Sequence, residues 1–419
     1  MTPPPNDDRA EVSTPSQEST QGLPGAGFAV VVLTSMNLLN YIDRYVPSAV
    51  KDLFKKDLGL TDAQTSLPLS AFVIVYMLAS PVFGSLADKV SRTRLIAAGV
   101  ALWSVATAAA AFAVDFYTFL FARALVGVGE AAYATLAPPL LADFYGPEKR
   151  NRILAIFYVA IPVGAAIGFT LGGFLGANWG WRTAFLVCGV PGIFAAGAAL
   201  LIQDPGRAAT EPAAVAVSWP EALVKLRGIP SYVYAVAGYT AVTFAAGGMA
   251  DWFPVYLTRV RGMEMAAAGT AIGTVTVVGG LFGTMVGGFV GERLKHRTRQ
   301  PLLAVSAWSM VLAAAFAAAA LLVPDVGASI ACIGVAQFFL WFYNGPINTL
   351  IANSVGADMR ARAFALSILC IHLLGDAISP PIIGFVSDQT GSLGGAVLLV
   401  PVFMALGAAI WMRGWRVVT

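Results

Sequence analysis

Residues 84–94, with the sequence Gly-Ser-Leu-Ala-Asp-Lys-Val-Ser-Arg-Thr-Arg, decide the fold class. They place a glycine, a carboxylate and several cations between two long apolar runs. A glycine in such a turn lets two helices approach closely, and a carboxylate there can cap the N-terminus of a neighbouring helix. Arginines beside a membrane span favour the cytoplasmic side. The stretch therefore predicts a tight turn at the cytoplasmic surface of a membrane, in which Arg92 and Arg94 can pair with Asp88 or its neighbours.

The same pattern returns half a chain later, which predicts an internal duplication. Gly288-Phe-Val-Gly-Glu292 again follows an apolar run and precedes further cations, and Asp251 echoes Asp43 at a similar offset. One such turn alone is compatible with an ordinary basic loop. Repeats half a chain apart are typical of transporters built from two similar helical bundles with the substrate path between them.

The composition excludes a water-soluble fold. Hydrophobic residues make up 58% of the 419 residues, charged residues make up 12%, and the mean hydropathy is +0.74. Soluble domains carry roughly 25% charged residues. No basic tract indicates nucleic-acid binding, and the three single cysteines and two histidines lack the spacing of metal or disulfide sites. We therefore expect no metal, no cofactor and no catalytic residues, because no nucleophile–base pair is visible either.

Apolar stretches of about 20 residues, which are long enough to cross a bilayer, occur twelve times. They lie near residues 27–49, 64–87, 94–114, 117–142, 151–174, 182–203, 231–257, 265–291, 301–323, 328–354, 362–386 and 393–413. We therefore expect an all-α membrane protein with twelve transmembrane helices in two pseudo-symmetric six-helix bundles. The expected domains are a disordered tail (1–24), an N-terminal bundle (25–203), a cytoplasmic linker (204–230) and a C-terminal bundle (231–419).

The distribution of cations predicts the orientation in the membrane. With the N-terminus inside, the inner segments hold 18 of the 26 cations and the outer loops hold 6. This excess places both termini in the cytoplasm. We expect a monomer in the plasma membrane, which is the inner membrane of a bacterial cell.

The remaining two cations, Arg44 and Arg123, fall inside spans that also carry acids. Asp43 is adjacent to Arg44, and Glu130 lies two helical turns after Arg123 on the same face. A charge at a helix centre costs about 2.5–3.5 kcal/mol on insertion scales, so it faces protein or water and usually has a function. An arginine that moves towards or away from a shielded carboxylate changes the affinity of that carboxylate for a proton. These four residues therefore predict proton coupling or substrate binding. The alternative is a permanent buried ion network that holds the first and fourth spans together.

The C-terminal half offers different side chains. His372 and Asp376 are i, i+4 neighbours and fit either a structural hydrogen bond or a proton relay, whereas Asp251 lies near the outer end of its span, where solvation is expected. The tenth span carries no charge but has Trp341, Asn344 and Asn348 on one face. A charged wall facing an aromatic, amide-bearing wall would suit an amphipathic anion, with its head group at an arginine.

The chain resembles a major facilitator superfamily transporter over about residues 25–415. The stretch 84–94 is similar to the loop motif between spans two and three of that superfamily. The other matching positions are Arg123, Gly127 and Gly129 in the fourth span and Gly164, Gly168 and Gly172 in the fifth.

More narrowly, the chain resembles the Spinster family of lipid transporters, although related organic-anion carriers share several of the same residues. The matching stretches are Asn40-Tyr-Ile-Asp43-Arg44-Tyr45, Gly129-Glu130-Ala-Ala-Tyr133, Phe157-Tyr-Val-Ala-Ile-Pro162-Val-Gly164 and Gly238-Tyr-Thr-Ala-Val-Thr-Phe244. The resemblance implies an alternating-access carrier of a lysophospholipid or sphingoid phosphate, and it adds Tyr133 to the expected site. The alternative is a proton-coupled carrier of small organic anions or drugs. A membrane-embedded lipid enzyme or a channel is much less favoured.

Pseudo-symmetry also predicts a cytoplasmic gate. Asp88 is expected to reach the start of the span near Arg362, and Glu292 the start of the span near Arg152. Each anion would stabilise a positive helix end by about 0.3–1 kcal/mol. The complete predicted gate is Gly84, Asp88, Arg92, Arg152, Gly288, Glu292 and Arg362. The alternative is that these turns serve only membrane insertion and topology.

Overall fold

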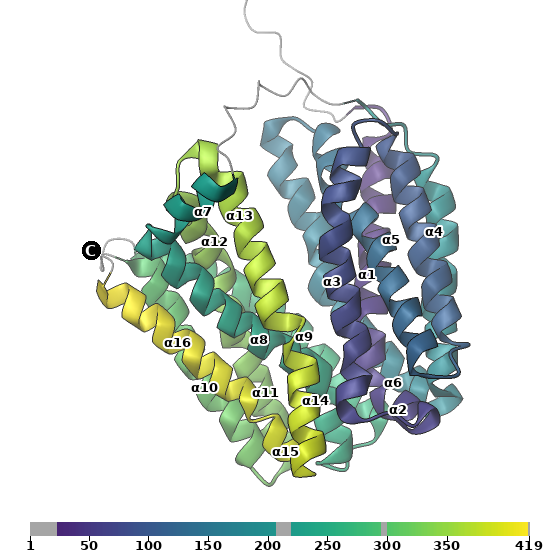
Figure 1. Cartoon of the computed structure of the whole chain (residues 1–419), viewed down its shortest axis with the longest axis vertical. Coiled ribbons are helices and arrows are strands. Elements are labelled where there is room, and N and C mark those ends of the chain that lie inside the picture. Colours follow the sequence, from purple (N-terminus) through teal and green to yellow (C-terminus); the bar gives the residue numbers. More distant parts are fainter. Residues whose placement is uncertain (1–22, 207–218, 295–299, 418–419) are drawn as a thin grey trace, which may run out of the picture.

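The structure is a computed structural model that describes residues 23–206, 219–294 and 300–417. The chain forms a set of long helices that run side by side (Figure 1). The tail expected over residues 1–24 lies almost entirely outside the described residues.

The first half of the chain forms one group of helices. Their bounds are α1 (Ala26–Ala49), α2 (Lys51–Leu58), α3 (Asp62–Leu86), α4 (Arg92–Ala110), α5 (Phe116–Asp143) and α6 (Pro147–Ala199). Two of these helices begin at clear sequence signals, because Thr61 before α3 and Asp115 before α5 each form a capping box with the residue three positions later. Such a box satisfies two of the N–H groups that every helix start leaves unpaired.

The second half forms the other group. Its elements are α7 (Trp219–Arg227), α8 (Pro230–Arg259), α9 (Met265–Arg293), α10 (Pro301–Leu322), α11 (Val326–Leu340), η2 (Trp341–Tyr343), α12 (Asn344–Asn353), α13 (Ala357–Ile371), η3 (His372–Asp376), α14 (Ser379–Thr390), α15 (Leu393–Ala396) and α16 (Leu399–Val417).

Two spans expected as single helices are interrupted. The tenth span contains the 3-10 turn η2, and the eleventh contains the π-helical turn η3. Pro346 explains the first interruption, because it has no N–H to donate to the carbonyl of Phe342 four residues earlier. Single π-turns occur frequently at functional sites, so η3 indicates a candidate functional site in this span.

Within the described residues, eleven continuous helical segments are long and apolar enough to cross a membrane. One of them, α6, contains two spans joined at Gly180, whose φ of 83° and ψ of 167° interrupt the helix. Only glycine adopts this backbone conformation readily. The segments therefore provide the twelve spans that the sequence predicts.

Small residues allow α6 to lie directly against α1. A Cβ atom at Gly168 would stand 2.7 Å from the carbonyl oxygen of Ile42, and one at Gly164 would stand 2.7 Å from the Cβ of Tyr41. Close backbone approach through glycine is typical of helix packing in membranes, where dispersion contacts replace the hydrophobic effect. Because this contact determines which face of α1 packs against α6, it also determines which face of α1 points away from α6.

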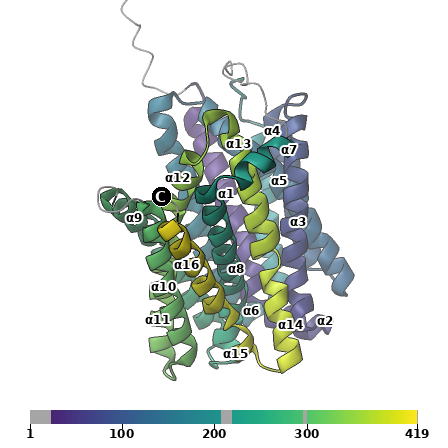
Figure 2. The ribbon, with the colours of Figure 1, turned by 60° about the vertical axis from the view of Figure 1, so that its left-hand side comes forward.

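The two groups of helices meet at the end that carries α2 and diverge towards the end that carries α7 (Figure 1). At the α2 end, the carboxylate of Asp388 in α14 accepts hydrogen bonds from the backbone N–H groups of Asp62 and Ala63, each at 2.9 Å. In the rotated view of Figure 2, α7 and the start of α13 lie together at the opposite end. We refer to these as the α2 end and the α7 end.

Candidate transport site

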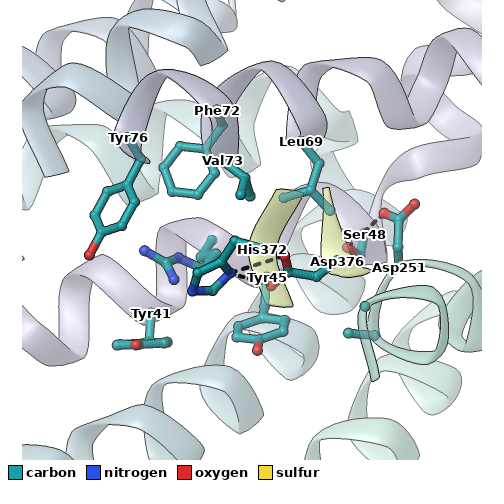
Figure 3. Close-up of a pocket in the computed structure, with 13 residues that line it drawn as sticks. Tyr41, Tyr45, Ser48, Leu69, Phe72, Val73, Tyr76, Asp251, His372 and Asp376 are labelled. Atoms are coloured by element: carbon teal, nitrogen blue, oxygen red, sulfur yellow. Dashed lines mark hydrogen bonds and ion pairs between the residues drawn. The ribbon is translucent and has the colours of Figure 1, made fainter. Parts of the chain in front are cut away.

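A cavity of about 210 Å³ lies between the two groups of helices. Figure 3 shows side chains from both groups pointing into it. The lining residues are Tyr41, Arg44, Tyr45, Ser48, Leu69, Phe72, Val73, Tyr76, Gly247, Ala250, Asp251, His372 and Asp376. The first eight come from α1 and α3, and the last five come from α8 and η3.

Arg44 is the cation of this cavity. One of its terminal nitrogens donates to Glu130 at 2.6 Å, and its guanidinium stands 4.9 Å from the ring centroid of Tyr41 and 5.0 Å from that of Phe72. Glu130 is fully buried, whereas about a quarter of the Arg44 side chain is exposed. The second carboxylate oxygen of Glu130 and Nε of Arg44 have no hydrogen-bond partner. The pair therefore keeps an unused acceptor and an unused donor beside the cavity.

Asp43 belongs to a separate and better satisfied pair. It accepts from Arg123 at 3.1 Å and from the hydroxyl of Thr107 at 2.5 Å. Both members of the pair are buried. The two adjacent acidic and basic residues of α1 thus reach different partners on α4 and α5, because neighbouring helical residues point about 100° apart. Both carboxylate oxygens of Asp43 are satisfied, unlike those of Glu130.

The second group of helices contributes acids to the cavity wall. His372 Nδ1 lies 3.0 and 2.9 Å from the two carboxylate oxygens of Asp376, within η3 (Figure 3). Both side chains are partly exposed to the cavity. The π-helical turn brings η3 against α8, where a Cβ at Gly247 would stand 2.7 Å from the Cβ of Asp376.

The sequence predicts that Asp251 is solvated, but the structure shows that it is buried. Its carboxylate accepts from Lys51, from Ser66 at 2.7 Å and from Ser48 at 3.2 Å. Lys51, which the sequence places in an outer loop, is only 1% exposed and begins helix α2. A buried carboxylate requires such partners, since an unpaired buried charge is strongly destabilising.

The aromatic, amide-bearing wall that the sequence predicts on the tenth span does not border this cavity and stays a prediction. Trp341, Asn344 and Asn348 are absent from the lining of the cavity. Trp341 donates to Gln337 at 3.2 Å, and Asn348 donates to the carbonyl of Asn344 at 2.7 Å. Asn348 also forms a side-chain hydrogen bond with Tyr239 of α8. The aromatic residues of the cavity come instead from α1 and α3.

Tyr133 also lies away from the cavity. It is fully buried, and its hydroxyl donates to the carbonyl of Leu33 at 2.6 Å. Its ring packs edge-on against Trp103, with 5.4 Å between the ring centroids. Its position is that of a packing residue between α1, α4 and α5.

The predicted gate residues lie at the α7 end. Arg92 does not pair with Asp88 as expected, but forms hydrogen bonds of 2.5 Å with both Asp143 and Asp204. The reason is that the end of α5 and the chain after α6 place two carboxylates beside it. The turn around Gly84 makes no tight helix contact, since a Cβ there would meet only a methyl of Thr135 at 3.8 Å.

Three further gate residues have different surroundings. Arg362 stands 6.0 Å from the ring centroid of Trp219 in α7, whereas Arg152 is exposed. A Cβ at Gly288 would meet nothing within 4 Å. The predicted cytoplasmic latches of Asp88 and Glu292 therefore stay predictions.

The sequence reasoning missed Tyr45, Ser48 and Tyr76 as lining residues. The sequence does contain a signal for Ser48, because Tyr41, Arg44 and Ser48 follow one another at helical spacings of three and four residues and therefore share a helix face. Tyr45 and Tyr76 carried no such signal, since only the tertiary arrangement of α1 and α3 around the cavity brings them together.

Two helical groups that enclose a charged cavity, and that meet at one end and diverge at the other, are the architecture of a secondary transporter. The sequence model of the Major Facilitator Superfamily matches residues 33–380. Protein spinster of Drosophila melanogaster is 33% identical over 379 residues, which cover 86% of this chain and 62% of that protein. Protein spinster homolog 1 of Homo sapiens is 32% identical over 420 residues, which cover 90% of this chain and 77% of that protein.

The fold has a close counterpart among solved structures. A bacterial homolog to the human lysosomal transporter Spinster, crystallised in an inward-facing and unoccupied conformation, superposes with a TM-score of 0.81 at 22% identity. The match covers 94% of this chain and 97% of the other. This chain therefore belongs to the major facilitator superfamily and, within it, to the Spinster family. It is an integral membrane transporter and not an enzyme, as the sequence predicts.

Proposed function

We propose that this transporter carries a single-chain anionic lipid, of the lysophospholipid or sphingoid-phosphate type, together with protons. The observation that carries the proposal is the pair of Arg44 and Glu130 at the cavity, with one carboxylate oxygen of Glu130 unpartnered. Arg44 is the cation available to an anionic head group there, and arginine binds phosphate in a bidentate manner.

The charge balance of this pair supports proton coupling. When an anionic head group takes the place of Glu130 on Arg44, the buried Glu130 is left without its cation and is expected to bind a proton. When the anion leaves, Arg44 returns to Glu130 and the proton is released. Asp43 has its own partners, because Arg123 and Thr107 donate to the two oxygens of its carboxylate.

The dimensions of the cavity support a head-group site. Pockets for drug-sized ligands commonly measure about 300–1,000 Å³, so a cavity of about 210 Å³ accommodates a head group more readily than a complete lipid. A second, apolar groove of about 390 Å³ lies between α6 and α9, and its lining includes Ile167, Phe174 and Val277. Partial exposure of Ile167 and Phe174 on the outside of the helices suits contact with an acyl chain.

We assign the α7 end to the cytoplasm, because the excess of cations predicts it. The helices meet at the α2 end, so the conformation is open towards the cytoplasm under this assignment. The latches of Asp88 and Glu292 belong to the opposite conformation, in which the α7 ends close. Both termini then face the cytoplasm of a monomer in the inner membrane of a bacterial cell.

The second candidate is a proton-coupled carrier of small organic anions or drugs. The small volume of the cavity favours it, because a compact anion would fit there without the groove. Comparison of substrates that share a head group and differ in chain length separates the two candidates.

The proposal is tested by uptake of labelled lysophosphatidate into proteoliposomes with an imposed pH gradient. We expect uptake that collapses when a protonophore removes the gradient, and no uptake of the uncharged monoacylglycerol with the same chain. Transport of both lipids at equal rates would contradict the proposed anion site. Uptake at the same rate with and without the pH gradient would contradict proton coupling but not the anion site.

A further inference from the structure

Lys51 and Asp251 form an ion pair between the two groups of helices. Lys51 begins α2 in the first group, and Asp251 lies in α8 of the second. The side chains are 1% and 3% exposed. This pair plays no part in the site proposed above, although Asp251 borders the same cavity.

The partners of Lys51 divide between the two groups. Its ammonium donates to Ser66 of α3 at 2.8 Å, which belongs to the first group. The carboxylate of Asp251 and the ring of Trp252, 3.9 Å from the nitrogen to the ring centroid, both belong to α8. When α8 moves away during alternating access, Lys51 keeps a hydroxyl and loses its anion. A buried ammonium in that position needs another anion or water.

The surroundings of Lys51 connect it to Arg44. A small cavity of about 10 Å³, enough for about one water molecule, has a mixed lining in which Arg44, Ser48, Lys51, Arg123 and Asp251 stand beside apolar residues such as Phe54 and Phe119. Arg44, Ser48 and Asp251 also border the central cavity. Lys51 thus stands seven residues further along the chain than Arg44, towards the α2 end, on the same path.

Cations continue beyond this point to the surface. Lys55 pairs with Asp62, and Arg259 pairs with Asp52 and Asp62, at the α2 end. A row of cations therefore runs from Arg44 past Lys51 to the α2 surface. Each member has a carboxylate partner. The pair of Lys51 with Asp251 and the pairs of Arg259 with Asp52 and Asp62 join α8 to the first group, so all of them separate when α8 moves as a unit, and Lys51 is the buried cation of the first group that then loses its anion.

We propose that Lys51 is a second anion-binding residue of the transport path, which exchanges Asp251 for the head group of an anionic substrate when the α2 ends separate. The inference rests on the proposed function, because it requires an anionic substrate. Asp251 then acts as a competitor, since its return to Lys51 displaces the head group and closes the α2 end.

The experiment compares variants of the two residues in vesicles of known protein orientation. Lysophosphatidate is presented to the α2 side or to the α7 side, and its apparent KM is measured on each. Lys51→Gln should raise the KM on the α2 side by roughly tenfold or more, because a charge-assisted hydrogen bond is lost. Asp251→Asn should lower the KM on the same side, because the competitor loses its charge while Lys51 keeps its own.

Opposite changes in the two variants distinguish a binding residue from a mere closing contact. If the pair only held the α2 end shut, both substitutions would weaken it and shift the KM in the same direction. Lys51→Arg should restore binding on the α2 side. Lys56→Gln, which removes an exposed lysine from the same helix, should leave both KM values unchanged.

A double variant controls for misfolding caused by an unpaired buried charge. Lys51→Gln combined with Asp251→Asn leaves no unpaired buried charge, and it should bind as weakly from the α2 side as Lys51→Gln alone. Equal KM values in all these variants would overturn the role of Lys51 while leaving the proposed function intact. Absence of lysophosphatidate transport by the unmodified protein would overturn both.

Discussion

Arg44 of α1 donates to Glu130 of the neighbouring helix α5 at 2.6 Å, and the second oxygen of that carboxylate has no partner. The neighbouring pair of Asp43 and Arg123 has no such vacancy on its carboxylate, because Thr107 occupies the remaining oxygen. Two buried pairs of the same chemical type therefore differ in whether the carboxylate keeps an unused acceptor oxygen.

Substitution of Glu130 should separate coupling from binding. Glu130→Gln should abolish uptake driven by a pH gradient but keep downhill exchange of lysophosphatidate, because Arg44 remains free to bind the anion. Asp43→Asn should impair both processes, since it leaves Arg123 buried without its anion. Gradient-driven uptake and exchange measured on the same vesicles test this difference. Full coupling in Glu130→Gln would assign the proton to another residue.

Filling the apolar groove should affect long chains selectively. Ile167→Trp occupies part of the space between α6 and α9 and should raise the KM of long-chain lysophosphatidate more than that of a short-chain analogue. Val187→Trp, a matched change at an exposed apolar position elsewhere on α6, should alter neither. An equal effect of Ile167→Trp on both chain lengths would favour the small-anion carrier.

Asp388 should stabilise closure of the α2 end. Its carboxylate caps the start of α3 through the N–H groups of Asp62 and Ala63, and Asp388→Ala should remove about 1 kcal/mol, a change of roughly fivefold in the ratio of the two conformations. Spin-label distances across the α2 end should show a larger open population. The idea fails if those distances keep their original distribution in a correctly inserted protein.

Asp88 should have the opposite effect on the equilibrium. If it caps the span near Arg362 when the α7 ends close, Asp88→Asn should disfavour that closed form and increase the population open at the α7 end. The magnitude should be about 0.3–1 kcal/mol. Cysteine accessibility at the α7 end measures the change. An unchanged conformational ratio would leave the turn with a role in topology only.

Asp57 gives a prediction on pH and stability outside the membrane spans. The hydrogen bond from Arg182 and then that from Trp181 hold the pKa of Asp57 below its usual range. A depressed pKa contributes stability above the unfolded value of about 3.9, and the contribution disappears as the pH falls through the folded value. Asp57→Asn should therefore lower the Tm slightly near neutral pH, and the difference should vanish in acid. A difference that persists in acid would point to packing instead.

The sequence by itself determined the membrane class, the twelve spans and the family. These follow from local properties, since hydropathy over about 20 residues and short motifs such as residues 84–94 do not depend on distant contacts. It also identified Arg44, Arg123, Asp43 and Glu130, because a charge inside a span requires a partner or a function wherever it finally lies.

Only the tertiary structure decided which of these charges pair and which face the cavity. Lys51 and Asp251 looked like solvated residues near the ends of their segments, and Trp341 looked like part of the substrate wall. Burial of the first two depends on α8 packing against α1, α2 and α3, which are about 200 positions away in the chain. Trp341 donates to Gln337 of its own span and does not line the cavity, which the helical spacing of Trp341, Asn344 and Asn348 alone does not reveal. Long-range packing of this kind leaves no periodic signal in a single sequence.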